Sequence, residues 1–220
     1  MNTEIRQERP EDYRRTEEVT REAFWNQFMP GCVEHYLLHV MRDSSAFVPE
    51  LDLVAVEDGT LAGHAAAVKG TIRGDDGRVR QVLTLGPISV LPEYQGRGIG
   101  GRLLAAVKER AAEMGFPALL LCGDPAYYSR HGFVPAEQFG IRTADGMYMA
   151  ALQACELREG ALKGAAGRYF EDSVYEISGE EAEAFDRTFP PKEKLAGVKM
   201  QKRFEELAAM VREGENSKNN

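Results

Sequence analysis

A glycine-rich turn between an apolar run and an amphipathic segment constrains this chain more than any other feature of its sequence. The turn, residues 95–101, reads QGRGIGG and follows the apolar residues 82–91. After the turn, apolar side chains recur every three or four residues until Gly115. These patterns predict a strand, a tight turn and a helix that ends at Gly115. Gly86 and Pro87 stand in the middle of the strand and predict a bulge or bend there.

The turn has the composition of a phosphate-binding loop. Because glycines carry no side chain, backbone N–H groups close on a ligand at the positive end of the helix dipole. Arg97 stands inside the loop and adds a charge-assisted contact. The turn is therefore predicted to bind a phosphate or a pyrophosphate.

Two other interpretations of the turn are open at this point. In the first, the glycines are present only because a tight turn from strand to helix needs their backbone freedom. In the second, the turn belongs to a dinucleotide fold, because residues 96–101 satisfy G-x-G-x-x-G and Asp124 stands where an acidic ribose ligand would follow. Against the dinucleotide fold, residues 92–95 separate the strand from the first glycine, and no further strand–helix–strand unit of ordinary length follows Asp124.

Two sequence blocks give the turn a third interpretation. Residues 90–100, VLPEYQGRGIG, resemble the acetyl-CoA signature of the GCN5-related N-acetyltransferases, Q/R-x-x-G-x-G/A, with Gln95, Gly98 and Gly100 in its defined places. After an apolar run, residues 127–133, YYSRHGF, are similar to the second block of that family. Both blocks have the right order and spacing, and the resemblance covers residues 3 to about 157. It looks most like an uncharacterised bacterial subgroup of acetyltransferases.

The resemblance implies an α+β fold in which helices flank a mixed, mostly antiparallel central sheet with one splayed parallel strand pair. Residue patterns agree with this order. They predict strands at Ile5 and over residues 51–56, 61–72, 82–91 and 118–122, and helices after Asp12 and over residues 32–42.

The C-terminal part of the chain extends past the family core. We expect an acetyltransferase domain over residues 1–157 and an extension of strand and helix over residues 158–220. Residues 147–157 are predicted to close the sheet, and residues 168–177 to form a further strand. A short helical stripe that includes Phe204, Leu207, Ala208 and Val211 precedes a tail, residues 214–220, expected to be disordered. For the stripe, packing within the chain, a homodimer contact and a lid over the acceptor cleft are all open.

The resemblance also implies where coenzyme A binds. In the family, the pantetheine arm pairs with the backbone of the splayed strand, here Ile88, Ser89 and Val90. The pyrophosphate is then expected on the turn residues Gln95, Gly96, Arg97, Gly98, Ile99, Gly100 and Gly101. Acetyl-CoA is the implied cosubstrate.

Acetyl transfer to an amine requires one proton to leave the ammonium and one to reach the departing sulfur. Tyr128 aligns with the tyrosine that the family places beside the sulfur, and it is the expected general acid; the alternative is a core aromatic. The base is open, because Cys122 stands where some relatives place a glutamate. Asp124, His64 and Glu22 are candidates.

Cys32, His35 and His39 share one predicted helix, and two or three ligands on a short helix are weak support for a metal site. We therefore expect no metal and interpret the two histidines as a solvated or cleft-lining polar face.

Composition limits the partners. The 220 residues carry a formal net charge of −8, which disfavours a long-lived complex with nucleic acid. No apolar stretch is long enough to span a bilayer, and residues 1–20 are charged. Three scattered cysteines argue against a disulfide framework and favour a cytoplasmic location.

The expected function is transfer of an acetyl group from acetyl-CoA to a primary amine, on a small molecule or a peptide, by direct attack in a ternary complex. One alternative is a CoA-binding sensor or regulatory module without turnover. A more distant alternative is the dinucleotide-binding oxidoreductase.

Overall fold

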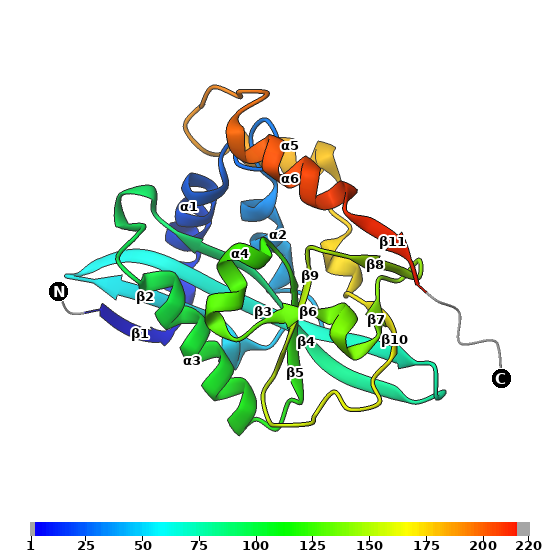
Figure 1. Ribbon diagram of the computed structural model, residues 1–220. Coiled ribbons are helices and arrows are strands. Elements are labelled where there is room, and N and C mark those ends of the chain that lie inside the picture. Colours follow the sequence, from blue (N-terminus) through cyan, green and yellow to red (C-terminus); the bar gives the residue numbers. More distant parts are fainter. Residues whose placement is uncertain (1–2, 215–220) are drawn as a thin grey trace.

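The computed structural model describes residues 3–214, and a mixed nine-stranded sheet runs through this part of the chain (Figure 1). Seven strands follow one another across the sheet, and two more attach beside the third. In spatial order the seven are β1 (Thr3–Gln7), β2 (Leu53–Glu57), β3 (Thr60–Gly74), β4 (Val79–Val90), β5 (Ala118–Cys122), β9 (Leu152–Glu156) and β6 (Val134–Pro135). The attached strands are β10 (Gly167–Phe170), which pairs with β3, and β7 (Ile141–Arg142), which pairs with β10.

Helices cover both faces of the sheet (Figure 1). On one face, Leu103 and Val107 of α3 pack against Leu83 and Leu119 of the sheet. The helices named in the described part of the chain are α1 (Tyr13–Phe24), α2 (Glu34–Met41), α3 (Ile99–Glu113), α4 (Pro125–Tyr128), α5 (Gly179–Asp186) and α6 (Lys199–Ala209). None of these helices is long and apolar enough to cross a membrane.

β4 parts from its parallel neighbour halfway along its length. It pairs with β5 only at Leu83 with Leu119 and at Thr84 with Leu120. On its other edge, the register with β3 shifts at the Gly86-Pro87 step, and pairing continues to Val90. Beyond Thr84, the edge of β4 that faces β5 therefore has no strand partner among the described residues. The predicted bulge and the splayed parallel pair are confirmed.

Two strand predictions in the C-terminal part are wrong. The run predicted as one strand over residues 147–157 is divided into β8 (Met147–Met149) and β9, because β8 pairs instead with β11 (Val211–Glu213) in a separate two-stranded sheet. The strand predicted over residues 168–177 ends at Phe170, because the Asp172 carboxylate accepts a hydrogen bond from the Val174 amide at 3.0 Å and starts a 3-10 turn. Val211, placed in the helical stripe, lies in β11.

The segment after residue 157 holds β4 in place. The Tyr169 hydroxyl on β10 shares a hydrogen bond with Thr84, and the Tyr175 hydroxyl donates to the Gly86 carbonyl at 2.7 Å. These two contacts lie on either side of the point where β4 leaves β5. The boundary at residue 157 stays a prediction, and residues 215–220 of the predicted tail lie outside the described residues.

The backbone of β10 lies so close to β3 that glycine is required at residue 167. A Cβ atom built on Gly167 overlaps the backbone of Arg73 and Gly74. Gly167→Ala should therefore force the strands apart and lower the free energy of unfolding by about 1–3 kcal/mol, measured by urea denaturation. The control is Gly179→Ala at the start of α5, where a Cβ meets no heavy atom within 4 Å. Equal stability of the two variants would contradict the close approach of the strands.

Candidate functional site

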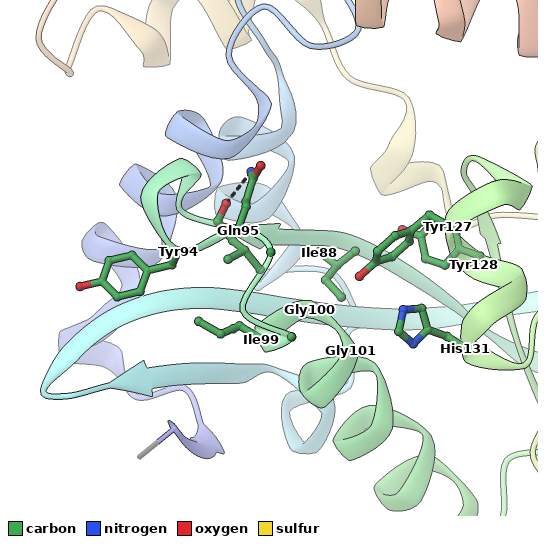
Figure 2. A pocket seen from close by; sticks show the side chains of 12 residues that line it. Ile88, Tyr94, Gln95, Ile99, Gly100, Gly101, Tyr127, Tyr128 and His131 are labelled. Atoms are coloured by element: carbon green, nitrogen blue, oxygen red, sulfur yellow. Dashed lines mark hydrogen bonds between the residues drawn. The ribbon is translucent and has the colours of Figure 1, made fainter. Parts of the chain in front are cut away.

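An open cavity of about 450 Å³ lies beside the end of β4 and the N-terminus of α3 (Figure 2). We call it the first cavity. Figure 2 shows Tyr127, Tyr128 and His131 on the side facing the glycine turn. Twelve residues from β4, the turn, α3, α4 and the segment after it line the cavity: Ile88, Val90, Tyr94, Gln95, Gly96, Gly98, Ile99, Gly100, Gly101, Tyr127, Tyr128 and His131. Eight of the ten predicted CoA-binding residues are therefore brought together here; Ser89 and Arg97 are not among the lining residues.

The N-terminus of α3 offers unpaired backbone donors to this cavity. The first helical hydrogen bond runs from the Arg102 amide to the Gly98 carbonyl at 3.1 Å. The amides of Ile99, Gly100 and Gly101 donate to no acceptor within residues 3–214. Since Gly98 has no side chain to cap the helix, these N–H groups and the positive end of the helix dipole face the cavity together. An anion is the ligand that such an arrangement favours.

The four glycines of the turn have two different roles. Gly96 and Gly98 have φ angles of +76° and +80°, in the left-handed region that favours glycine. Gly100 and Gly101 have ordinary angles, but a Cβ on Gly100 would lie 2.7 Å from the Tyr127 hydroxyl and one on Gly101 would lie 3.0 Å from the His131 ring. Conformational freedom alone therefore explains only half of the glycines. The other two let α4 and the following turn approach α3 and build the far wall of the cavity.

Three of the predicted contacts place their side chains elsewhere. The Gln95 amide folds back and donates to the Val90 carbonyl at 3.1 Å (Figure 2). The Arg97 guanidinium donates to the Glu93 carbonyl at 2.8 Å and lies 3.6 Å from Glu57. The buried Ser89 hydroxyl lies 3.1 Å from the hydroxyl of Thr20 on α1. Arg97 and Ser89 thus offer the cavity no side chain.

A second cavity, of about 480 Å³, opens where β4 and β5 part. It shares Ile88, Tyr127 and Tyr128 with the first cavity. Its other walls come from α1 and the residues after it, α2, β4, the end of β5, the segment after β10, and α6: Phe24, Phe28, Glu34, Leu37, Thr84, Leu85, Gly86, Pro87, Cys122, Gly123, Asp124, Ala151, Glu171, Tyr175, Met200, Arg203, Phe204 and Leu207.

Tyr128 stands on the boundary of the two cavities. Its ring packs edge-on against Tyr127 and Phe133, with centroids 5.0 and 5.6 Å apart, and the absence of a side chain at Gly123 leaves room for it. Its hydroxyl has no hydrogen-bond partner within residues 3–214. Burial, reinforced by Tyr127, raises the pKa of the Tyr128 phenol well above its usual range. The phenol is therefore protonated at neutral pH and can donate a proton.

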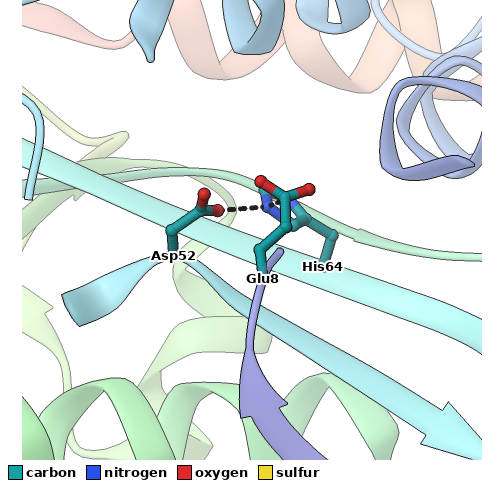
Figure 3. A group of neighbouring side chains, drawn as sticks. All are labelled: Glu8, Asp52 and His64. Carbon is teal, nitrogen blue, oxygen red and sulfur yellow. Dashed lines mark hydrogen bonds and ion pairs between the residues drawn. The ribbon is translucent and has the colours of Figure 1, made fainter. Parts of the chain in front are cut away.

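His64 lies apart from both cavities, in a buried group with Glu8 and Asp52 (Figure 3). Its Nε2 atom is 2.6 Å from an Asp52 carboxylate oxygen and 3.8 Å from Glu8. Burial lowers the pKa of His64 to about 4 and raises the pKa of Glu8 to about 7. The three groups are close enough to share an ion, but Arg42 donates to both Glu8 oxygens, at 2.9 and 3.0 Å. Hydrogen bonds and an ion pair thus account for the cluster.

The other two base candidates are held in ion pairs. Glu22 pairs with Lys192 at 2.6 Å and lines neither cavity. Asp124 lines the second cavity, where it caps α4 through the Ala126 amide at 2.9 Å and pairs with Arg203 at 3.1 Å. The hydrogen bond from Arg203 lowers the pKa of Asp124, which makes it a weaker proton acceptor.

Cys32, His35 and His39 do not converge. His35 is fully buried, with Nδ1 3.4 Å from the Cys32 sulfur, whereas His39 pairs with Glu17 at 2.9 Å on a half-exposed surface. The prediction of a solvated or cleft-lining face is wrong for His35, because α5 and Phe189 cover it.

Two carboxylates in the second cavity, Glu34 and Glu171, were not among the predicted site residues. Glu34 begins α2, and its carboxylate accepts the Val33 amide at 3.0 Å. Glu171 follows β10 and has no hydrogen-bond or ion-pair partner within residues 3–214. Burial raises the pKa of both carboxyl groups. No local sequence signal marks either residue, because only the fold brings them to one cavity.

The Cys122 thiol also opens into the second cavity. Burial and the neighbouring Glu171 carboxylate raise its pKa to about 12. The thiol is therefore protonated at neutral pH and is a poor nucleophile.

Comparison with known proteins identifies the family. Residues 5–133, more than half of the chain, match the model of the acetyltransferase (GNAT) family. The chain belongs to the GNAT family. The predicted resemblance and fold are thereby confirmed. Because β9 pairs antiparallel beside β5, residues 3–214 do not have the second parallel crossover there that a dinucleotide fold needs.

Among curated relatives of this GNAT chain are two uncharacterised N-acetyltransferases of Escherichia coli strain K12. YjhQ is 38% identical over 97 residues, which cover 44% of this chain and 52% of YjhQ, so the match spans about half of that relative. YhbS is 31% identical over 135 residues, which cover 61% of this chain and 78% of YhbS.

Two solved structures of GNAT proteins resemble this one. The structure of E. coli YhbS in complex with CoA has a TM-score of 0.71 and 26% identity, and covers 81% of this chain and 94% of its own. The structure of a GNAT acetyltransferase from Brucella melitensis in complex with acetyl-CoA has a TM-score of 0.61 and 29% identity. The match covers 79% of this chain and 98% of the Brucella chain.

Because His64 is buried and lines neither cavity, its replacement should affect the stability of this GNAT fold. His64→Ala leaves the buried Asp52 carboxylate without its partner, and we expect the free energy of unfolding to fall by about 1–3 kcal/mol in urea denaturation. His39→Ala is the matched control on the half-exposed surface, where the change should stay within about 0.5 kcal/mol. Equal stability of both variants would contradict a structural role for His64.

Proposed function

We propose that this protein is an N-acetyltransferase that moves the acetyl group of acetyl-CoA to a primary amine by direct attack in a ternary complex. The observation that carries the proposal is that two cavities share Tyr128 where β4 and β5 part. One cavity ends on unpaired amides at a helix N-terminus, and the other is open for a second substrate. Binding of CoA by YhbS and of acetyl-CoA by the Brucella protein supports the assignment of the first cavity.

We assign acetyl-CoA to the first cavity along its whole length. Its pyrophosphate is assigned to the amides of Ile99, Gly100 and Gly101, in the left-handed turn made by Gly96 and Gly98. Its pantetheine arm is assigned to the β5-facing edge of β4 at residues 88–90, which pairs with no strand within residues 3–214. This order leads the thioester toward Tyr128.

Tyr128 is the proposed general acid. The nitrogen of the amine attacks the thioester carbonyl carbon, the C–N bond forms and the C–S bond breaks. The leaving thiolate takes a proton from the phenol, which the raised pKa keeps protonated until that step. The second proton lost by the nitrogen restores the phenol, so the acid is regenerated.

A CoA-binding module without turnover is the second candidate. The observation that favours it is Cys122, a protonated thiol and not a carboxylate, at the end of β5. Calorimetry with CoA and release of thiol from acetyl-CoA in the presence of primary amines separate the two candidates. CoA binding without thiol release on any amine would select the binding module, and absence of CoA binding would overturn both.

Removing the Tyr128 hydroxyl should slow acetyl transfer and leave cosubstrate binding intact. We expect Tyr128→Phe to lower kcat by about 10²-fold or more, with the KM for acetyl-CoA little changed, in a thiol-release assay. Tyr148→Phe removes the hydroxyl of a ring that packs under the Arg212 guanidinium and lines neither cavity, and it should retain full activity. Equal kcat values in the two variants would remove Tyr128 from the mechanism.

The left-handed conformation of Gly98 gives a test of the CoA site. Alanine at this φ costs about 1–2 kcal/mol, and a turn that relaxes from it no longer presents its amides together. The dissociation constant for CoA in calorimetry should therefore rise about 5–30-fold in Gly98→Ala. Gly160→Ala introduces the same strain at a φ of +74°, outside both cavities, and should leave CoA affinity unchanged. Unchanged affinity in Gly98→Ala would contradict the assignment.

A further inference from the structure

The walls of the second cavity are chiefly apolar and aromatic. Phe24 and Phe28 at the end of α1 have ring centroids 5.7 Å apart, and Phe28 lies 4.9 Å from Phe204 of α6. Leu37 on α2 and Leu207 on α6 continue this surface. Such walls favour a ligand that buries an apolar body, and a cavity of about 480 Å³ has room for an aromatic ring on a short chain.

Some charged side chains of the second cavity form ion pairs and others do not. Arg203 and Asp124 neutralise each other at 3.1 Å. Glu34 and Glu171 have no cationic partner within residues 3–214, so they leave the cavity net negative. A cationic group on the ligand would meet the charge that these two carboxylates leave uncompensated.

Glu171 has the better position of the two for chemistry. Its neighbours in the sequence, Tyr169 and Tyr175, are hydrogen-bonded to Thr84 and Gly86 of β4, on either side of the point where that strand leaves β5. Glu171 also lines the same cavity as Cys122, at the end of β5, and after burial its carboxylate is the second cause that raises the pKa of that thiol. Glu34, by contrast, has its carboxylate held by the Val33 amide at the start of α2. Glu171 is thus the unpartnered carboxylate beside the parting of the strands.

We propose that the second cavity binds a primary amine carried on an apolar, ring-sized body, and that Glu171 receives the ammonium group and accepts its proton. This inference rests on the proposed acetyl transfer. Glu171 takes one proton from the ammonium and passes it to solvent, which frees the nitrogen lone pair for attack on the thioester carbon. The nitrogen loses its second proton as the C–S bond breaks, and that proton balances the one that Tyr128 gives to the thiolate. The products are the N-acetyl amine, CoA and one proton in solution.

An amine panel tests the substrate class. We expect kcat/KM for 2-phenylethylamine to exceed that for ethanolamine and for spermidine by at least about tenfold in a thiol-release assay with acetyl-CoA, because only the first buries an apolar body. A preference for ethanolamine or spermidine would overturn the acceptor class and leave the acetyltransferase standing. CoA binding without acetylation of any amine would overturn the proposed function and this inference with it.

Substitution of the two carboxylates tests the role of Glu171. With 2-phenylethylamine, Glu171→Gln should lower kcat/KM by about 10²-fold or more and leave the dissociation constant for CoA unchanged in calorimetry. The exposed Glu176→Gln, outside the cavity, should match the wild type in both measurements. A loss confined to Glu34→Gln would move the role to α2 and overturn the assignment of Glu171.

The pH dependence separates a proton acceptor from a residue that only shapes the cavity. Burial raises the pKa of Glu171, so this carboxylate becomes protonated, and unable to accept a proton, as the pH falls through that raised value. In the wild type, the fall of kcat/KM at acid pH should therefore report two ionisations, that of the amine substrate and that of Glu171. Glu171→Gln should lose the second ionisation. If the acid side keeps the same slope in Glu171→Gln, the group it reports is not Glu171.

Discussion

The parting of β4 from β5 is the constraint on which the rest of the structure depends. Two residue pairs join the strands, and beyond Thr84 the backbone of β4 on that side has no strand partner among the described residues. Buried backbone groups are otherwise satisfied by secondary structure, so an open strand edge that leads to the free N-terminus of α3 favours an extended ligand with an anionic end. Both cavities begin at this opening. The bulge at Gly86-Pro87 thus lies where an ordinary strand–helix–strand unit opens into two cavities.

The segment that follows the family match completes the site. The match to the GNAT model ends at residue 133, yet β10, the turn after it and α6 supply Glu171, Tyr175 and Phe204 to the second cavity. Tyr175 anchors the bulge by donating to the Gly86 carbonyl. In this chain the first cavity, proposed for acetyl-CoA, is therefore built by the part that matches the family, and the wall of the second cavity is built in good part by the segment outside the match. Differences in that segment offer a physical route to different acceptors on one catalytic framework.

Sequence reasoning located the glycine turn because its signals are local: a positive φ at Gly98 and an uncapped helix start depend on neighbouring residues. It did not find Glu171, because a carboxylate after a short strand looks like any solvated charge until β10 pairs with β3. His64 presents the opposite case. A histidine in a strand attracts attention as a base, and only the fold reveals that Asp52 and Glu8 occupy its surroundings. The prediction of one strand over residues 147–157 was wrong for the same reason, because the pairing of β8 with β11 joins segments far apart in the sequence.

The charges in the second cavity are consistent with the role proposed for Glu171. Burying an isolated carboxylate is costly, and folded chains usually offset that cost with a cation. Within residues 3–214, the buried Glu8 pairs with Arg42, and the largely buried Asp186 pairs with Arg21. Glu171 is an exposed residue that lines the second cavity, so its carboxylate does not carry that cost. Arg203 also lines the second cavity, but its guanidinium pairs with Asp124 and forms no ion pair with Glu171. An ammonium group in the second cavity would meet the unpaired Glu171 carboxylate, which in the proposed reaction accepts the proton that the amine must lose.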